Sequence, residues 1–303
     1  MNLRKSLILG SIAFTAGLLA LPISAEAASG IQISPLTFNL EIPTTASSSG
    51  SIIVTNQNDT VLNYVIETEN FASVDDQGAV SFAGQEEPTG VTSLADWFTY
   101  DSPKEGSLAP RKDTTINFTI DVPEGAEPGG HYAAIFAREV KKNPSGQAEI
   151  GIASRVGTLV LVSVPGITTK TAQMSDFTYP KFVWHGPNEF TMKVKNTGTV
   201  HYDSKGTVEL KSILGQVTTV DMGSHTIIPN SSRTYLGTWL SKYPFGYYNV
   251  TASVLDGNNQ PVTETGIIWA IPLLIVIPTI LGLIILIWLI TYLRKHLRFV
   301  SKE

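Results

Sequence analysis

The sequence predicts an all-β protein: two tandem immunoglobulin-like β-sandwiches followed by one C-terminal transmembrane helix. Three observations support this prediction. Short runs of alternating apolar and polar residues recur through most of the chain, separated by Gly, Pro and Asn. The landmarks of the first half return in the second half. One stretch near the C-terminus, Ile267–Ile290, contains 24 residues without a charge.

This apolar stretch has the length and composition of a membrane span. Seventeen of its 24 residues are Ile, Leu or Val. A helix of that length extends about 36 Å, more than the roughly 30 Å of a bilayer core. A buried core helix is the less favoured alternative, since such helices rarely run so far without a charge. We therefore expect a helix at 267–293 that contacts the lipid bilayer through Ile267–Leu293.

The two termini predict how the chain is oriented. Residues 294–303 are rich in Lys and Arg, which favours a basic cytoplasmic tail. At the other end a basic pair precedes the apolar run Leu7–Leu21, and Ala25-Glu26-Ala27 offers a cleavage site. Residues 1–27 are therefore interpreted as a signal peptide, with an uncleaved anchor as the alternative. The expected localisation is the cell membrane, single-pass, with the N-terminus and ectodomain outside and the C-terminus in the cytoplasm.

Composition limits what the exported part can be. The chain contains no cysteine, so each domain must be held by its core alone, and a bacterial source is favoured. Residues 28–167 carry 7 Lys+Arg against 17 Asp+Glu, a net charge of −10. Residues 168–266 carry 8 against 7, a net charge of +1. Because an acidic outer domain repels phosphate backbones, nucleic-acid binding is excluded.

Alternation identifies the strands. Apolar residues occupy every second position in two runs, Leu36, Phe38, Leu40 and Ile42, and Ile116, Phe118, Ile120 and Val122. Further β-rich runs are SIIVTN, HYAAIFARE and GTLVLVSV. No segment before Ile267 has a convincing helical period. Short strands with frequent turn residues are typical of a sandwich.

Two landmarks indicate an internal repeat. Asn56, at the end of one strand run, corresponds to Asn196, with an offset of 140 residues. Pro110, which precedes another run, corresponds to Pro229, with an offset of 119. The first copy then holds 140 − 119 = 21 extra residues, within Phe71–Leu108. The predicted domains are 28–167 and 168–266. Chance reuse of turn residues is the alternative explanation.

No pattern of catalytic residues is found. The five histidines stand outside HExxH and other metal-ligand spacings, no cysteine is available as a nucleophile, and no Walker or dinucleotide glycine pattern follows a strand. We expect no enzyme activity, no cofactor and no metal site. The acidic pairs Asp75-Asp76 and Glu86-Glu87 could hold Ca²⁺, although a solvated surface is the favoured interpretation.

Four aromatic or imidazole side chains are the candidate binding residues. Trp97 and Tyr100 lie in the segment that only the first copy contains, and rigid amphipathic rings suit glycan stacking or a protein contact. His131 and Tyr132 could form part of a polar recognition site. Packing is the favoured interpretation for two of these positions: Trp97 or Phe98 could close the open end of the first sandwich, and Tyr132 could belong to the core.

The mature chain resembles a known family in the order of its motifs. ISPLTFNLEI, IIVTNQND, SLADWFTYD, LAPRKDTTINFTIDVP and GGHYAAIFA resemble the N-terminal domain of bacterial WxL-interacting proteins. VKNTGTVHYDSKGTVELKSILGQV, IIPNSSRTYLGTW and FGYYNVTA resemble the second domain of related wall-associated proteins. The resemblance implies that residues 28–167 form a peptidoglycan-binding domain and that the second domain contacts a partner.

The expected function follows from anchor, charge and resemblance together. It is a membrane-anchored bacterial cell-surface binding or scaffold protein whose ectodomain contacts peptidoglycan or a wall-associated protein. The alternative is an accessory or sensing subunit of a membrane protein assembly. The acidic charge of 28–167 favours neutral glycan or a basic partner over anionic wall polymers.

Overall fold

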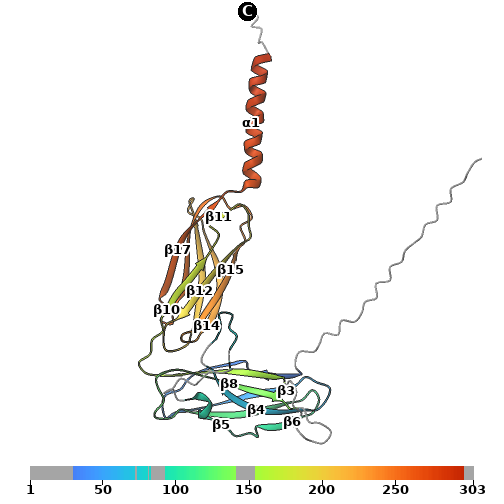
Figure 1. The fold of residues 1–303 in the computed structure, drawn as a ribbon, viewed down its shortest axis with the longest axis vertical. Coiled ribbons are helices and arrows are strands. Elements are labelled where there is room, and N and C mark those ends of the chain that lie inside the picture. Colours follow the sequence, from blue (N-terminus) through green and yellow to red (C-terminus); the bar gives the residue numbers. More distant parts are fainter. Residues whose placement is uncertain (1–29, 72–73, 81, 83–92, 141–153, 297–303) are drawn as a thin grey trace, which may run out of the picture.

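The computed structural model describes residues 30–71, 74–80, 82, 93–140 and 154–296. This part is predominantly β with one long C-terminal helix, as the sequence predicts. Figure 1 shows a first β unit, a second β unit and the helix following one another along the long axis. The expected signal peptide at 1–27, the pair Glu86-Glu87 and the tail beyond 296 lie outside the described residues.

The first unit consists of two sheets with the strand orders β1-β3-β7-β5 and β2-β9-β8-β4-β6. Paired strands run antiparallel, except that β2 lies parallel to β9. Its elements are β1 (Ile31–Ser34), β2 (Thr37–Glu41), β3 (Ser47–Asn56), β4 (Leu62–Asn70), the 3-10 helix η1 (Leu94–Trp97), β5 (Phe98–Tyr100), β6 (Glu105–Leu108), β7 (Asp113–Asp121), β8 (Gly129–Glu139) and β9 (Arg155–Val164).

The second unit has the sheets β10-β12-β15 and β11-β17-β16-β13-β14, in which only β11 and β17 pair in parallel. Its strands are β10 (Ala172–Thr178), β11 (Phe182–Val183), β12 (Asn188–Asn196), β13 (Tyr202–Ser212), β14 (Val217–Ile227), β15 (Ser232–Trp239), β16 (Gly246–Leu255) and β17 (Pro261–Ala270).

Alternation of side chains builds one core in each unit. In β7, Ile116, Phe118 and Ile120 are fully buried while the residues between them face outward. They belong to a cluster that draws on both sheets of the first unit. A separate cluster around Phe190 and Tyr235 fills the second unit. Burial of each such large side chain contributes about 1.5–3 kcal/mol, which makes these clusters the main source of stability.

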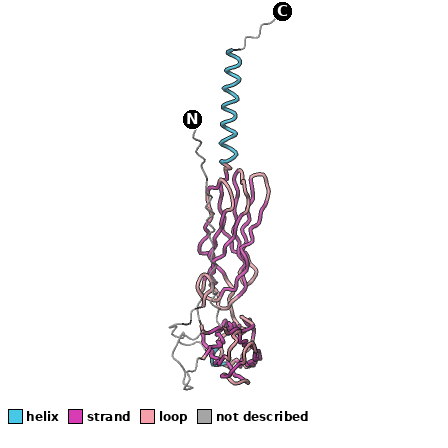
Figure 2. Tube along the Cα trace, turned by 90° about the vertical axis from the view of Figure 1, so that its right-hand side faces the viewer, coloured by secondary structure: helices cyan, strands magenta, loops and turns pink. Residues whose placement is uncertain are grey.

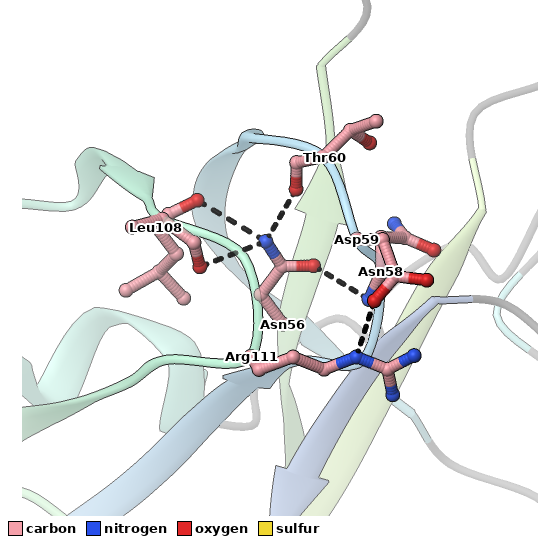
Figure 3. A network of polar contacts seen from close by, with 7 residues as sticks. Asn56, Asn58, Asp59, Thr60, Leu108 and Arg111 are labelled. Atoms are coloured by element: carbon pink, nitrogen blue, oxygen red, sulfur yellow. Dashed lines mark hydrogen bonds and ion pairs between the residues drawn. The ribbon is translucent and has the colours of Figure 1, made fainter.

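The repeat inferred from the sequence is present in atomic detail. The buried Asn56 donates from Nδ2 to the carbonyl oxygens of Thr60 and Leu108, at 2.8 and 3.1 Å (Figure 3). Asn196 donates in the same way to the carbonyl oxygens of Val200 and Ile227, at 3.0 and 2.8 Å.

The offsets of this hydrogen-bond network match those of the sequence. They are 196 − 56 = 140 for the asparagines and 227 − 108 = 119 for the second acceptors. The left-handed residues Arg111 and Asn230, with φ of 58° and 59°, are likewise 119 apart. Val54 pairs with Thr114, and Val194 pairs with Arg233, so the offsets hold through the strand ladders as well.

The C-terminal helix begins later than the sequence indicates, and this is a correction. The helix α1 spans Leu273–His296, whereas Ile267–Ala270 form the end of β17. Ile268 and Ala270 are buried in the core of the second unit, so the apolar character of this segment serves packing. Pro272 separates strand from helix. The segment Leu273–Lys295 is long and apolar enough to cross a membrane.

Candidate functional site: an open sheet edge beside the junction

Two of the four predicted binding residues meet inside the first unit. The Trp97 indole, at the end of η1, is 6% exposed and packs against the His131 ring at a centroid distance of 4.6 Å. His131 Nε2 lies 2.9 Å from the carbonyl oxygen of Glu127. Trp97 also belongs to the core cluster of the first unit. This placement is what a packing role requires, and a binding role stays a prediction.

Tyr100 lies apart from that pair, on β5. Its ring packs beside Phe98 and Phe118, and its hydroxyl lies 2.6 Å from Thr68 Oγ1. Burial raises the pKa of the Tyr100 phenol, which keeps the group neutral. The Lys104 ammonium lies 4.6 Å from the centre of the ring. Tyr100 therefore holds the short strand β5 against the sheet.

Tyr132 lies at the junction between the two units, a contact that the sequence pattern does not predict. The backbone N–H of His201 donates to the Tyr132 hydroxyl at 3.1 Å. His201 Nε2 lies 2.8 Å from Asn39 Oδ1 on β2. Tyr132 also packs with Phe71, and Ile228 of the second unit completes the same apolar cluster. The junction thus combines apolar burial with oriented polar contacts.

A loop of the first unit reaches across this junction onto β15. Within the loop, Val74 and Val80 form an isolated β-bridge. The Thr234 N–H donates to the Asp76 carbonyl oxygen at 2.9 Å, and the Asp76 carboxylate forms an ion pair with Lys193. The loop belongs to the segment that only the first copy contains. That segment therefore supplies contacts between the units as well as β5.

The carboxylates of the acidic pair Asp75-Asp76 make hydrogen bonds and an ion pair within this chain. The Asp75 carboxylate accepts the backbone N–H groups of Gln77 and Ala79 at 2.9 and 2.7 Å. The Ala79 bond is the largest of the effects that hold the pKa of Asp75 below its usual value. Among the described residues, no group of three or more His, Cys, Asp or Glu side chains could hold a metal ion.

The hydrogen bond from Thr234 defines which edge of β15 is open. Thr234 pairs with Lys193 of β12 in the ladder but sends its N–H to Asp76, away from β12. In an antiparallel ladder every second residue points its N–H and C=O to the same side. The backbone N–H and C=O groups of Leu236 and Thr238 therefore also point away from β12. Within the described part of the chain, these backbone groups have no backbone hydrogen-bond partner on that side.

The first unit fills the equivalent position with a strand of its own. There β5 pairs with β7 through Phe98↔Ile120, Thr99↔Thr119 and Tyr100↔Phe118. Adding the offset of 119 to residues 118–120 gives 237–239, at the C-terminal end of β15. The sheet β10-β12-β15 has three strands where the corresponding sheet β1-β3-β7-β5 has four. We call the outward side of 236–239 the vacant edge.

The surroundings of the vacant edge differ from those of β5. In the first unit, Phe98 and Tyr100 pack against Phe118 from the added strand. In the second unit, Val220 and Met222 of β14 lie beside the inner face at Gly237. The longer β14 thus keeps this part of the core covered without hydrogen bonding to β15. The Leu236 side chain is 63% exposed, so an apolar contact is available at the vacant edge.

The junction is expected to weaken in acid because of His201. Burial, opposed in part by the Asp203 carboxylate and aided by Lys170, lowers the pKa of His201 from 6.5 to about 4. Between about pH 6.5 and pH 4, the His201 imidazole therefore binds a proton in the unfolded chain but not in the folded chain. The contribution of neutral His201 to the free energy of unfolding is fully present above about pH 6.5. It is lost as the pH falls toward about 4, and the total loss is about 3 kcal/mol.

This pH dependence can be measured as the thermal unfolding midpoint between about pH 7 and pH 4.5. His201→Gln should flatten the profile, because glutamine cannot take up the proton. His185→Gln, at an exposed loop position, is the matched control and should follow the unaltered chain. Identical profiles for His201→Gln and the unaltered chain would contradict the assignment.

Comparison with known proteins gives a likeness of fold at low identity. No family model matches the chain, and no curated protein matches it. Similar solved structures include the class 5 fimbriae chaperone CfaA, at 14% identity and a TM-score of 0.42, covering 78% of this chain and 98% of the other. Another is the Salmonella enterica SafA pilin in complex with the SafB chaperone, at 8% identity and 0.38, covering 78% and 96%. The E. coli chaperone DraB has 14% identity and 0.35, covering 78% and 95%.

These comparisons correct the family and the ligand inferred from the sequence. The resemblance to WxL-interacting proteins is wrong, since no family model matches and the similar solved structures include fimbrial chaperones and no WxL-interacting protein among those named. Peptidoglycan and wall-associated proteins are withdrawn as partners for the same reason. Both predicted functions, the wall-binding scaffold and the accessory or sensing subunit, are withdrawn as well.

Proposed function

We propose that this chain is a polypeptide-binding protein that takes an extended segment of a protein partner onto β15 as an added strand. The vacant edge carries the proposal: Leu236 and Thr238 direct unpaired backbone groups outward, at a position that β5 occupies in the first unit. Exposed edges recruit extended peptides because each new backbone pair satisfies both chains. No catalytic step belongs to this function.

Magnitudes indicate what else the partner must supply. Leu236 and Thr238 together offer two N–H and two C=O groups, and a net bond contributes about 1 kcal/mol. Four such bonds correspond to an affinity of about 1 mM before the cost of association. The partner segment must therefore also bury apolar side chains. The exposed Leu236 favours a segment with apolar residues at alternate positions.

The fold supports a difference in role between the two units. We infer that each unit is an immunoglobulin-like sandwich, because both combine a smaller sheet with a five-stranded sheet in the same strand order. The boundary falls at Val164–Ile167, after β9. The first unit completes its smaller sheet internally, and the second leaves that sheet open to another chain.

A photocrosslinking amino acid at Thr238, an exposed residue of the vacant edge, tests the function in cells of the source organism. The expected product is a crosslinked adduct whose partner peptide has apolar residues at alternate positions. The same crosslinker at Gln260, at the far end of the second unit, should give no such adduct. Absence of an adduct at Thr238 would count against the proposal.

Leu236→Pro makes the crosslinking experiment specific for backbone pairing. Proline removes the outward N–H of Leu236 but no hydrogen bond to β12, so the melting temperature should change little. The adduct at Thr238 should be lost. Leu236→Thr, which keeps the N–H and removes the apolar side chain, should reduce the adduct less. An adduct that survives Leu236→Pro unchanged would rule out strand addition.

The location of the chain is part of the proposal. We propose that α1 anchors it as a single span, with both β units outside and the basic end in the cytoplasm. The length and hydropathy of Leu273–Lys295 and the following Arg and Lys residues support this orientation. Protease added to intact cells should then remove the β units and leave the segment from Arg294 protected. Units that resist the protease until the cells are lysed would refute the orientation.

A further inference from the structure

Three loops of the second unit lie at the end from which α1 begins. β17 ends there at Ala270, which pairs with Gly246 at the start of β16 and with Val183 at the end of β11. Ser212, at the end of β13, pairs with Tyr248. The loops 184–187, 213–216 and 240–245 therefore share this end. Figures 1 and 2 show the helix rising from this end of the second unit, next to β11 in Figure 1.

Each of these loops exposes large apolar side chains. Leu214 and Leu240 are each 79% exposed, and Phe245 and Trp184 are 66% and 51% exposed. Trp269, near the end of β17, is also exposed, and it pairs with Tyr247 at the same end of the second unit as the loops. We call these five residues the apolar rim. Contributions from three loops and a strand make a surface, in contrast to the scattered single apolar residues of ordinary protein surfaces.

Most charges at this end are positive, although Glu189 places a carboxylate one residue into β12. Lys181, Lys211 and Lys242 are exposed there, and residues 179–187, 211–217, 240–247 and 267–272 contain no Asp or Glu. The loops at the opposite end of the unit are polar, as in Asp256–Gln260. Apolar and aromatic tips with lysines around them match the outer leaflet of a bilayer, where rings lie at the headgroup level and lysines reach phosphate.

The helix fixes the height of the apolar rim. Only Ile271 and Pro272 separate β17 from α1, and the Ile271 N–H donates to the Val183 carbonyl oxygen at 2.9 Å. The second unit therefore cannot move far from the point where the helix enters the bilayer. Residues 273–294 extend about 33 Å as a helix, which matches the roughly 30 Å hydrocarbon core. The bilayer surface then falls near Leu273, level with the loops.

We propose that the apolar rim of the second unit is seated in the headgroup region of the outer leaflet, so that the unit stands on the membrane as well as being tied to it. This inference rests on the membrane anchorage proposed above. It adds a lipid contact made by the β domain itself. We infer a bilayer as the binding partner because the rim is continuous with the span and the lysines around the rim complement anionic lipids.

The absence of cysteine makes the proposal directly measurable. Full-length protein with the single substitution Leu214→Cys is labelled with an environment-sensitive fluorophore and placed in vesicles of phosphatidylcholine and phosphatidylglycerol. Lipids that carry a nitroxide quencher at the headgroup or near the bilayer centre then report depth. Gln260→Cys, at the opposite end of the unit, and Ile284→Cys, within α1, are the matched labels.

The expected pattern separates the rim from the anchor. The Leu214 label should lose most of its emission to the headgroup quencher, the Ile284 label to the deep quencher, and the Gln260 label to neither. Quenching at Ile284 without quenching at Leu214 would overturn the rim and leave the anchor intact. No quenching at Ile284 would overturn the anchorage and the rim together.

A second variant asks whether the apolar side chains hold the position. Trp184→Ser, Leu240→Ser and Phe245→Ser are combined, once in the chain labelled at Leu214 and once in the chain labelled at Ile284. Headgroup quenching at Leu214 should fall toward the level of the Gln260 label, while deep quenching at Ile284 stays unchanged. Unchanged quenching at Leu214 would assign its depth to the tether alone and overturn the proposal.

Discussion

Replacing Asn56 by alanine is expected to lower the free energy of unfolding of the first unit by about 4 kcal/mol. The Asn56 side chain is fully buried and donates from Nδ2 to the carbonyl oxygens of Thr60, Leu108 and Ala109. Its Oδ1 accepts the N–H of Asn58 at 2.9 Å. Alanine removes this partner from all four backbone groups. The Ala109 carbonyl oxygen keeps the Lys112 N–H as a donor at 3.2 Å, and each group left unsatisfied costs about 1–3 kcal/mol.

The repeat supplies a matched experiment for this loss. Asn196→Ala removes the equivalent bonds to Val200, Ile227 and Gly198, so it should destabilise the second unit by a similar amount. Asn117→Ala, at an exposed position, should change stability by less than about 0.5 kcal/mol. Denaturant unfolding, followed by protection of each unit from proteolysis, distinguishes the two. A change below about 1 kcal/mol for Asn56→Ala would show that water replaces the lost contacts.

Trp97→Ala is expected to destabilise the first unit by about 3–5 kcal/mol. The indole belongs to the core cluster of the first unit and contacts the His131 ring, so truncation leaves a cavity in that core. The free energy of unfolding is the measurement. Trp184→Ala is the control, because the same residue type is exposed there and its removal opens no cavity.

This measurement also decides between the two roles considered for Trp97. A packing residue loses stability on truncation, and partner binding falls only as the unit unfolds. If Trp97→Ala kept its melting temperature and yet lost the crosslinked adduct at Thr238, recognition would be the role of the ring. Stability unchanged with binding unchanged would exclude both.

The sequence predicted the repeat because the repeat depends on local chemistry. The landmarks near Asn56 and Asn196 reflect one buried amide that satisfies the same turns in both units. The insertion of 21 residues in Phe71–Leu108 was located by the difference of two offsets. In the structure that segment holds η1, β5 and the loop that crosses to the second unit.

The same landmarks also explain the incorrect family assignment. IIVTNQND and VKNTGTV contain Asn56 and Asn196, and both asparagines serve backbone hydrogen bonds inside the fold. Motifs that a fold requires can recur in unrelated families, so they indicate architecture and carry little information about a ligand.

Contacts between distant segments could not be predicted from the pattern. The vacant edge depends on a strand that the second unit lacks, and the junction depends on Tyr132 meeting His201, 69 residues away. The start of α1 was misplaced because Ile267–Ala270 is apolar for a different reason from the span. Alternate residues there face a β core, and four residues are too few to separate that period from a continuous apolar run.

The direct passage from β17 into α1 has a mechanical consequence. If a partner is held at β15 and α1 is fixed in a bilayer, as proposed above, a pull on that partner would be transmitted along the axis of β17. The bonds of the β16–β17 ladder lie across that axis, so the load falls on all of them together, in shear, and does not open them one after another. The last strand is therefore placed to carry tension between the body of the second unit and α1.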